Sequence, residues 1–182
     1  PQEWGFDQTY GVYSGGSAHW DDTDMYPSVK VAEQAVAEGK KPPVTQQKFY
    51  ENGKQVKRVK GIYSDDLYTG KMIEYIEEGR ESGKPFFGYL ALTTAHFPLQ
   101  APAALIDKYT EMYEGLGYEG LKRQRYEQMI EAGVYQENTP YPADNPITKK
   151  WDDLSESEKK TQARLMATYA AMIETQDFYI GR

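Results

Sequence analysis

The sequence predicts an α/β fold with a mostly parallel sheet, and three neighbouring features support this fold class. Residues 86–92 form a short, uncharged, apolar run, which is typical of a strand buried on both faces. A helical pattern opens at Ser64 and ends before this run, which gives the helix-to-strand crossover that a parallel sheet requires. His96 follows the run, and ligands of open α/β sheets bind beyond the carboxyl ends of the strands.

Helix is the competing interpretation of residues 86–92. A proline before the run, a glycine inside it and its short length favour a strand. Ser64 is predicted to cap the preceding helix, because its side chain can accept a hydrogen bond from a free backbone amide. Gly79 and Gly83 are predicted to end that helix.

The segment over residues 47–60 predicts a β-hairpin. Two lysine-containing runs flank Asn52-Gly53, and an Asn-Gly pair favours a type I′ turn, in which both residues have positive φ. The segment before it, residues 27–44, shows no strong periodicity and is interpreted as a connection. The other expected elements are a helix that begins at Pro102, a helix over residues 121–132 that ends at Gly133, a proline-rich loop over residues 136–146, and a last helix that begins at a Ser155/Glu158 capping box.

Charge and composition exclude several classes of function. The net charge is −7, and no basic patch is rich enough for a nucleic-acid or membrane-surface partner. No apolar run approaches the roughly 18 residues that a membrane span needs. The chain has no cysteine, so it carries neither disulfides nor thiolate metal sites. We therefore expect no nucleic-acid partner and no membrane partner.

Three polar groups are candidate binding residues. His19, beside Trp20, is a candidate for substrate contact; a solvated histidine beside a packed aromatic ring is the alternative. Asp21 to Asp24 suggest calcium, but Tyr26 and Ala32 stand where an EF-hand loop needs glycine and glutamate, so no metal site is predicted. The Lys122 to Arg125 cluster fits either an anion site or a solvated helical face.

Three segments resemble one known family. Residues 84–102 (KPFFGYLALTTAHFPLQAP) are similar to the "PFF-x-YL…PHFPLQAP" segment of type I sulfatases, in the arylsulfatase branch. Residues 4–11 (WGFDQTYG) resemble the family's "GFD…YG", and residues 169–182 (YAAMIETQDFYIGR) resemble "YAAMIE…D…IGR". The segments occur in the family's order. Ala95 departs from the pattern, because the family usually has proline before the histidine.

The resemblance implies an alkaline-phosphatase-like three-layer sandwich, of which residues 1–182 would be an incomplete central segment of one catalytic domain. It implies hydrolysis of a small-molecule or carbohydrate sulfate ester by a mechanism that uses formylglycine and calcium. Residues 1–182 contain no C/S-x-P-x-R segment and none of the family's metal carboxylates, so we expect neither group on this chain and no activity from the chain alone. Only His96 carries over, as the residue that contacts the sulfate or assists the leaving group.

Alternatives to this function remain open at the level of sequence. His96 could be a capping or core histidine, since such residues are common after strands. A related phosphonate or phosphate monoester hydrolase is the alternative within the enzyme class, and a non-catalytic binding fragment is the alternative outside it. The resemblance suggests a periplasmic or secreted protein. Self-association is a further expectation, because a strand over residues 86–92 needs neighbouring strands.

Overall fold

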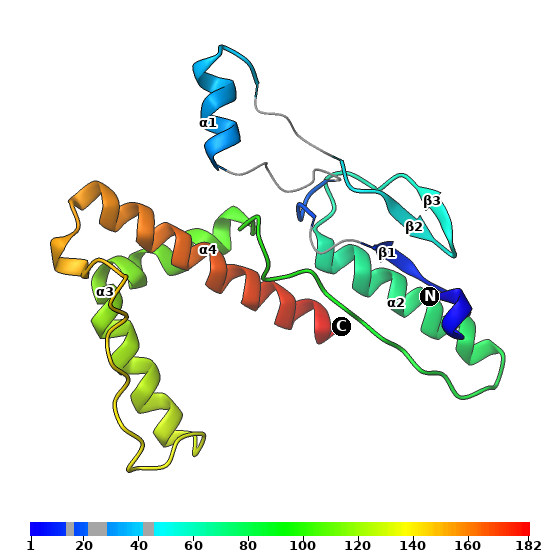
Figure 1. Ribbon diagram of the computed structural model, residues 1–182. Helices are drawn as coiled ribbons and strands as arrows, with labels where there is room; N and C mark the ends of the chain where they lie inside the picture. The colour runs from blue at the N-terminus through cyan, green and yellow to red at the C-terminus, as the bar shows by residue number, and fades with distance from the viewer. Residues whose placement is uncertain (14–16, 22–28, 42–45) are drawn as a thin grey trace. The chain divides into compact units, whose positions relative to one another are not determined.

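The chain forms two compact units (Figure 1). The computed structural model describes residues 1–13, 17–21, 29–41 and 46–182. The first unit comprises Pro1–Ala101 and Met172–Arg182, and the second comprises Pro102–Ala171. None of the described helices is both long and apolar enough to cross a lipid bilayer.

The first unit contains a three-stranded antiparallel sheet in the order β1-β2-β3, with β1 (Tyr10–Val12), β2 (Phe49–Glu51) and β3 (Lys54–Val56). Strands β2 and β3 form the predicted hairpin, with Glu51 opposite Lys54. Asn52 has φ 49° and Gly53 has φ 78°, so both turn residues adopt the positive φ that a type I′ turn requires. The hairpin prediction is confirmed.

Helix α2 (Ser64–Glu81) follows the hairpin and packs against strand β1, where the Tyr68 and Tyr10 rings lie 6.1 Å apart (Figure 1). Its N-cap residue is Tyr63, whose side chain makes no capping hydrogen bond, and Ser64 lies inside the helix, so the predicted capping role of Ser64 is wrong. The hydroxyl of Ser64 bonds to buried side chains instead, as described below. The helix continues through Gly79 and stops before Gly83, whose φ is 65°; of the two predicted end points, only Gly83 is confirmed.

Two short helices lie in segments for which the sequence predicted none. Helix α1 (Val29–Ala37) falls within the expected connection, and its Ala, Glu, Gln and Lys residues are good helix formers. A single 3₁₀ turn, η1 (Gln2–Trp4), opens the chain. Each is short, at nine and three residues, so its pattern is too brief to stand out in the sequence.

The predicted strand over residues 86–92 is not formed. The segment runs as an extended stretch after α2 (Figure 1), pairs with no strand among the described residues, and leaves Phe87 80% exposed. A strand exists only when its backbone groups pair with a neighbour, and the described strands pair only with one another, antiparallel. Within the described residues, therefore, the chain forms no part of the parallel sheet that its fold class predicts.

The second unit is built from α3 (Ala103–Glu131), η2 (Trp151–Asp153) and the first part of α4 (Glu156–Ile180). Helix α3 starts after Pro102 and ends before Gly133, as expected, and it is broken at Gly117, where φ is 59° and ψ is −170°. The break separates the two predicted helices. The buried core of this unit consists of Tyr113, Leu121, Ala163 and Ala167.

The predicted capping box begins α4. The backbone amide of Ser155 donates to Glu158 Oε2 at 2.7 Å, and the amide of Glu158 donates to Ser155 Oγ at 3.3 Å. The hydrogen bonds from Ser155 lower the pKa of Glu158 to about 2. This local prediction is confirmed, and its physical reason is the reciprocal pairing of amides that the first helical turn leaves free.

Replacing Gly117 by alanine should destabilise the second unit. A Cβ at this position would lie 2.8 Å from Trp151 Cδ1, and the backbone conformation there is one that only glycine adopts without strain. We expect Gly117→Ala to lower the free energy of unfolding by at least about 2 kcal/mol, measured by urea denaturation. Gly115→Ala is the matched control: a Cβ there meets nothing within 4 Å, so the substitution should be neutral or stabilise by up to about 1 kcal/mol. Equal effects of the two substitutions would contradict this account.

Candidate functional site

His96 lies at the end of a tight turn in the first unit, and its side chain is exposed. Its backbone amide donates to the Thr93 carbonyl at 3.0 Å, which closes the turn. Its ring nitrogen Nδ1 lies 3.0 Å from the Phe97 carbonyl. A carbonyl oxygen only accepts, so Nδ1 carries the proton, and Nε2 has no hydrogen bond to any described residue. Nε2 is therefore the nitrogen of this ring that stays without a partner among the described residues.

His19, the chain's other histidine, is fully buried. Its Nδ1 lies 2.8 Å from Ser64 Oγ, and its Nε2 lies 3.2 Å from the carbonyl oxygen of His96. The Tyr63 ring stacks on the imidazole with the centroids 5.6 Å apart. The expected substrate contact of His19 has no support in this geometry, because both ring nitrogens already have partners inside the protein.

His19, Ser64 and Asp65 form a buried cluster, in which Asp65 is the acid. Its Oδ1 accepts a hydrogen bond from the Thr94 hydroxyl and lies 3.2 Å from Ser64 Oγ. Its other oxygen, Oδ2, is buried without a hydrogen-bond partner among the described residues. Burial raises the pKa of Asp65, because the charged form loses hydration, while the hydrogen bonds from Thr94 and Ser64 act in the opposite direction. Burial lowers the pKa of His19 for the same physical reason.

The hydrogen bonds of His19, Ser64 and Asp65 balance in two protonation states. If His19 is neutral, its Nδ1 accepts from Ser64, and Ser64 in turn accepts from a protonated Asp65. If His19 is charged, its Nδ1–H donates to Ser64, which donates to an ionised Asp65. Burial favours the neutral state, because it lowers the pKa of His19 and raises the pKa of Asp65. In both states Nε2–H donates to the His96 carbonyl.

Further hydrogen bonds hold both ends of the segment that carries His96. The His19 amide donates to Gln100 Oε1 at 2.8 Å, and the Tyr63 hydroxyl donates to the Gln100 carbonyl at 2.7 Å. Gln176, in the last turns of α4, donates to the Thr94 carbonyl at 3.2 Å. The segment from Thr94 to Gln100 is therefore held by partners from three distant parts of the chain, and within it the side chain of His96 stays exposed.

Arg58 holds the backbone at His19 in place through hydrogen bonds. Its guanidinium donates to the carbonyl oxygens of His19 and Ile62, each at 2.9 Å, and the side chain is buried. Sequence reasoning missed Arg58, Asp65 and Thr94 as parts of the site. Their burial cannot be read from a local pattern, in which Ser64 predicts only a helix start.

The sequence predicts no metal site at the acidic cluster from Asp21 to Asp24, and of these residues the structure describes Asp21. Asp22, Thr23 and Asp24 of the acidic cluster lie outside the described residues. Within residues 1–13, 17–21, 29–41 and 46–182, no three His, Asp or Glu side chains are grouped so that they could hold a metal ion.

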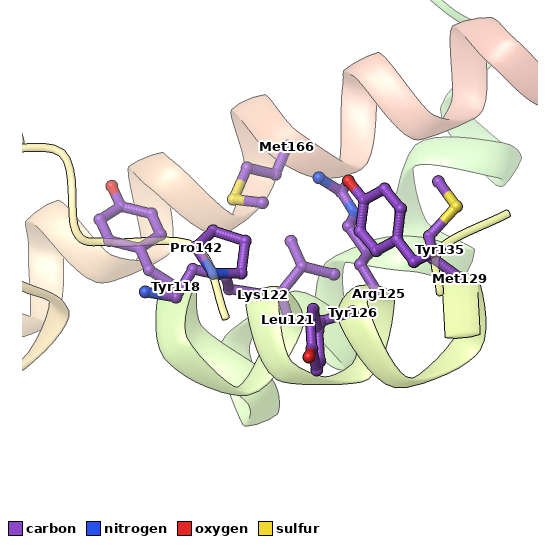
Figure 2. A pocket seen from close by; sticks show the side chains of 9 residues that line it. All are labelled: Tyr118, Leu121, Lys122, Arg125, Tyr126, Met129, Tyr135, Pro142 and Met166. Atoms are coloured by element: carbon purple, nitrogen blue, oxygen red, sulfur yellow. The ribbon is translucent and has the colours of Figure 1, made fainter. Parts of the chain in front are cut away.

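Lys122 and Arg125 of the Lys122 to Arg125 cluster line a pocket of about 360 Å³ in the second unit (Figure 2). Figure 2 shows Tyr118 and Tyr135 on opposite sides of Leu121 in the pocket lining. Lys122 lines the pocket but pairs with Glu119 at 3.1 Å and with Asp144. Arg123, which does not line it, also pairs with Glu119, at 3.6 Å. The ion pairs of Lys122 and Arg123 fit the alternative of a solvated helical face.

Comparison with known sequences gives a consistent result. The Sulfatase family model matches residues 1–182. The chain is 33% identical over 185 residues to "Uncharacterized sulfatase PB10D8.02c" of Schizosaccharomyces pombe (strain 972 / ATCC 24843), covering 100% of this chain and 31% of that protein. It is 29% identical over 181 residues to "Arylsulfatase" of Klebsiella aerogenes, covering 100% of this chain and 36% of that protein. The chain thus spans about a third of the length of these relatives.

A solved structure supports the fold class. The chain aligns over 100% of its length with 28% of Ps i-CgsB, with a TM-score of 0.50 and 22% sequence identity. The structure of Ps i-CgsB in complex with k-i-k-neocarrahexaose aligns over the same shares of the two chains, with a TM-score of 0.49 and 22% identity. The similarity to the first structure shows that the chain has the α/β fold of that protein.

Acidification should destabilise the protein in part through His19. Because burial lowers the pKa of His19, the unfolded state takes up a proton before the folded state as the pH falls through about 6.5. The stability that neutral His19 contributes is therefore present above that pH and lost below it. The urea midpoint of the wild type should fall more between about pH 7.5 and 5.5 than that of His19→Gln, which cannot titrate. An equal or larger fall in the variant would contradict the lowered pKa.

Proposed function

The chain belongs to the sulfatase family, and we propose that the protein containing it is a sulfuric-ester hydrolase. The match over the whole of residues 1–182 and the relatives named as sulfatases support this function. We further propose that His96 is its catalytic residue within this chain, with a sulfate ester of a small molecule or carbohydrate as substrate. The observation that carries this assignment is the contrast between the two histidines: His19 is enclosed, and His96 is exposed with Nε2 available.

Sulfate ester hydrolysis breaks an S–O bond, and the electron pair of that bond goes to the leaving oxygen. Protonation of this oxygen lowers the barrier, most strongly for alcohols that leave poorly. The hydrogen bond from Nδ1–H to the Phe97 carbonyl orients the His96 ring, so a charged imidazole can donate its second proton from Nε2. His96 thereby becomes neutral and the alcohol departs protonated.

The family resemblance also implies a formylglycine and a calcium ion. The chain contains no cysteine and no C/S-x-P-x-R segment, and its described residues include no cluster that fits a metal ion. The chain's own contribution to the reaction is therefore the placement of His96 and the transfer of its proton. A periplasmic or secreted location, which the family resemblance suggests, is part of the same proposal.

Removing His96 should slow turnover more for poor leaving groups than for good ones. In the full-length protein, we expect His96→Ala to lower kcat about 10²–10⁴-fold on phenyl sulfate, with a smaller change in KM. The loss on 4-nitrophenyl sulfate should be much smaller, because 4-nitrophenolate leaves without help from an acid.

His96→Gln is the matched control for this experiment. Glutamine can still donate a hydrogen bond to the sulfate but cannot transfer a proton, so it should show the same dependence on the leaving group as alanine. A loss that is equal for both esters would assign His96 to sulfate binding instead, and an unchanged kcat in a folded variant would remove it from the site. Assaying phenyl phosphate in parallel tests the phosphate monoester alternative.

A further inference from the structure

We infer that His19 is a positioning residue for His96: its buried imidazole, anchored by Ser64 and Asp65, holds the His96 backbone so that the exposed ring keeps one orientation. The inference rests on the proposed function of His96. Its basis is the direct contact between the two residues, in which Nε2–H of His19 donates to the His96 carbonyl at 3.2 Å.

His19 is itself fixed from both sides of its ring. Ser64 Oγ lies 2.8 Å from Nδ1, and the Tyr63 ring stacks on the imidazole face. The His96 carbonyl requires a proton on Nε2, so the imidazole cannot exchange its tautomer without breaking that bond. The donor that faces His96 is therefore permanent.

Two anchor points bracket His96 and share this support. The Thr94 hydroxyl donates to Asp65 Oδ1, and the His19 backbone amide donates to Gln100 Oε1 at 2.8 Å. Asp65 also lies 3.2 Å from Ser64 Oγ, so Thr94, His96 and Gln100 are all tied to the same buried cluster. Because Thr94, His19, Ser64 and Asp65 are buried, no water replaces a lost bond easily, and the loss of one partner shifts the whole segment.

The geometry of a catalytic group matters steeply for rate. A mutation far from the reacting atoms that displaces a catalytic group by about 1 Å can lower turnover about 10²-fold. A residue that sets the backbone position of His96 should thus change kcat even though it never touches the substrate.

A double-mutant cycle in the full-length protein tests this role. We expect His19→Leu to lower kcat on phenyl sulfate about 10- to 10²-fold, with a weaker effect on 4-nitrophenyl sulfate. In the His96→Ala background, the same substitution should lower kcat no further, because it acts through His96. If His19→Leu still lowers kcat in that background, the inference is overturned.

Thr69→Val is the control for a merely structural loss. Thr69 is buried and donates to the Asp65 carbonyl at 2.5 Å, so its replacement also removes a buried hydrogen bond beside the cluster. Among the described residues, the hydroxyl of Thr69 makes no hydrogen bond to the segment from Thr94 to Gln100. Thr69→Val should lower Tm and leave kcat unchanged. Should His19→Leu fail to fold, Ser64→Ala takes its place, with a kcat loss of several-fold that again vanishes without His96.

Histidine NMR supplies a readout that does not depend on turnover. The ring Cε1–H signal of His96, assigned by its disappearance in His96→Ala, should be single and sharp in the wild type. It should broaden or split in His19→Leu and stay sharp in Thr69→Val. An unchanged signal in His19→Leu overturns the inference. If the wild type turns over no sulfate ester, the proposed function fails, and the ring signal still decides whether His19 positions His96.

Discussion

The hydrogen bonds that run from Asp65 through Ser64 and His19 to the His96 carbonyl are the constraint on which the first unit depends. The side chains of Asp65, Ser64 and His19 lie in the interior, where an unsatisfied polar group costs about 1–3 kcal/mol. The cluster is consequently cooperative: breaking one bond exposes the desolvation cost of the next group. This cost explains how a segment without regular secondary structure can hold one conformation.

The members of this cluster come from parts of the chain that lie far apart in sequence. Helix α2 supplies Ser64 and Asp65 from its first turn, the segment around His19 supplies the buried imidazole, and α4 supplies Gln176. Arg58, which follows the hairpin, binds the His19 carbonyl. Burial lowers the pKa of His19 and raises the pKa of Asp65. Burying either polar side chain without a hydrogen bond would destabilise the fold, and Ser64 provides a hydrogen-bond partner to both.

The second unit is stabilised by a different interaction. Its core brings together the small side chains of Ala163 and Ala167 on α4 and the larger side chains of Tyr113 and Leu121 on α3. Trp151 lies against Gly117, at the break in α3, where a larger residue would have no room. The second unit is stabilised by apolar packing, which requires a glycine at position 117, whereas the site in the first unit is stabilised by hydrogen bonds.

The sequence by itself determined the features that depend on neighbours within four residues: the Asn52-Gly53 turn, the Ser155/Glu158 capping box and the helix ends at Gly83 and Gly133. It also determined the family, and it identified His96 as the functional candidate. Tertiary structure alone decided that residues 86–92 stay unpaired, that His19 is enclosed, and that Ser64 and Asp65 serve a buried cluster rather than a helix cap. The physical reason is range: turns and caps are closed by adjacent backbone groups, whereas strand pairing and burial depend on partners tens of residues away.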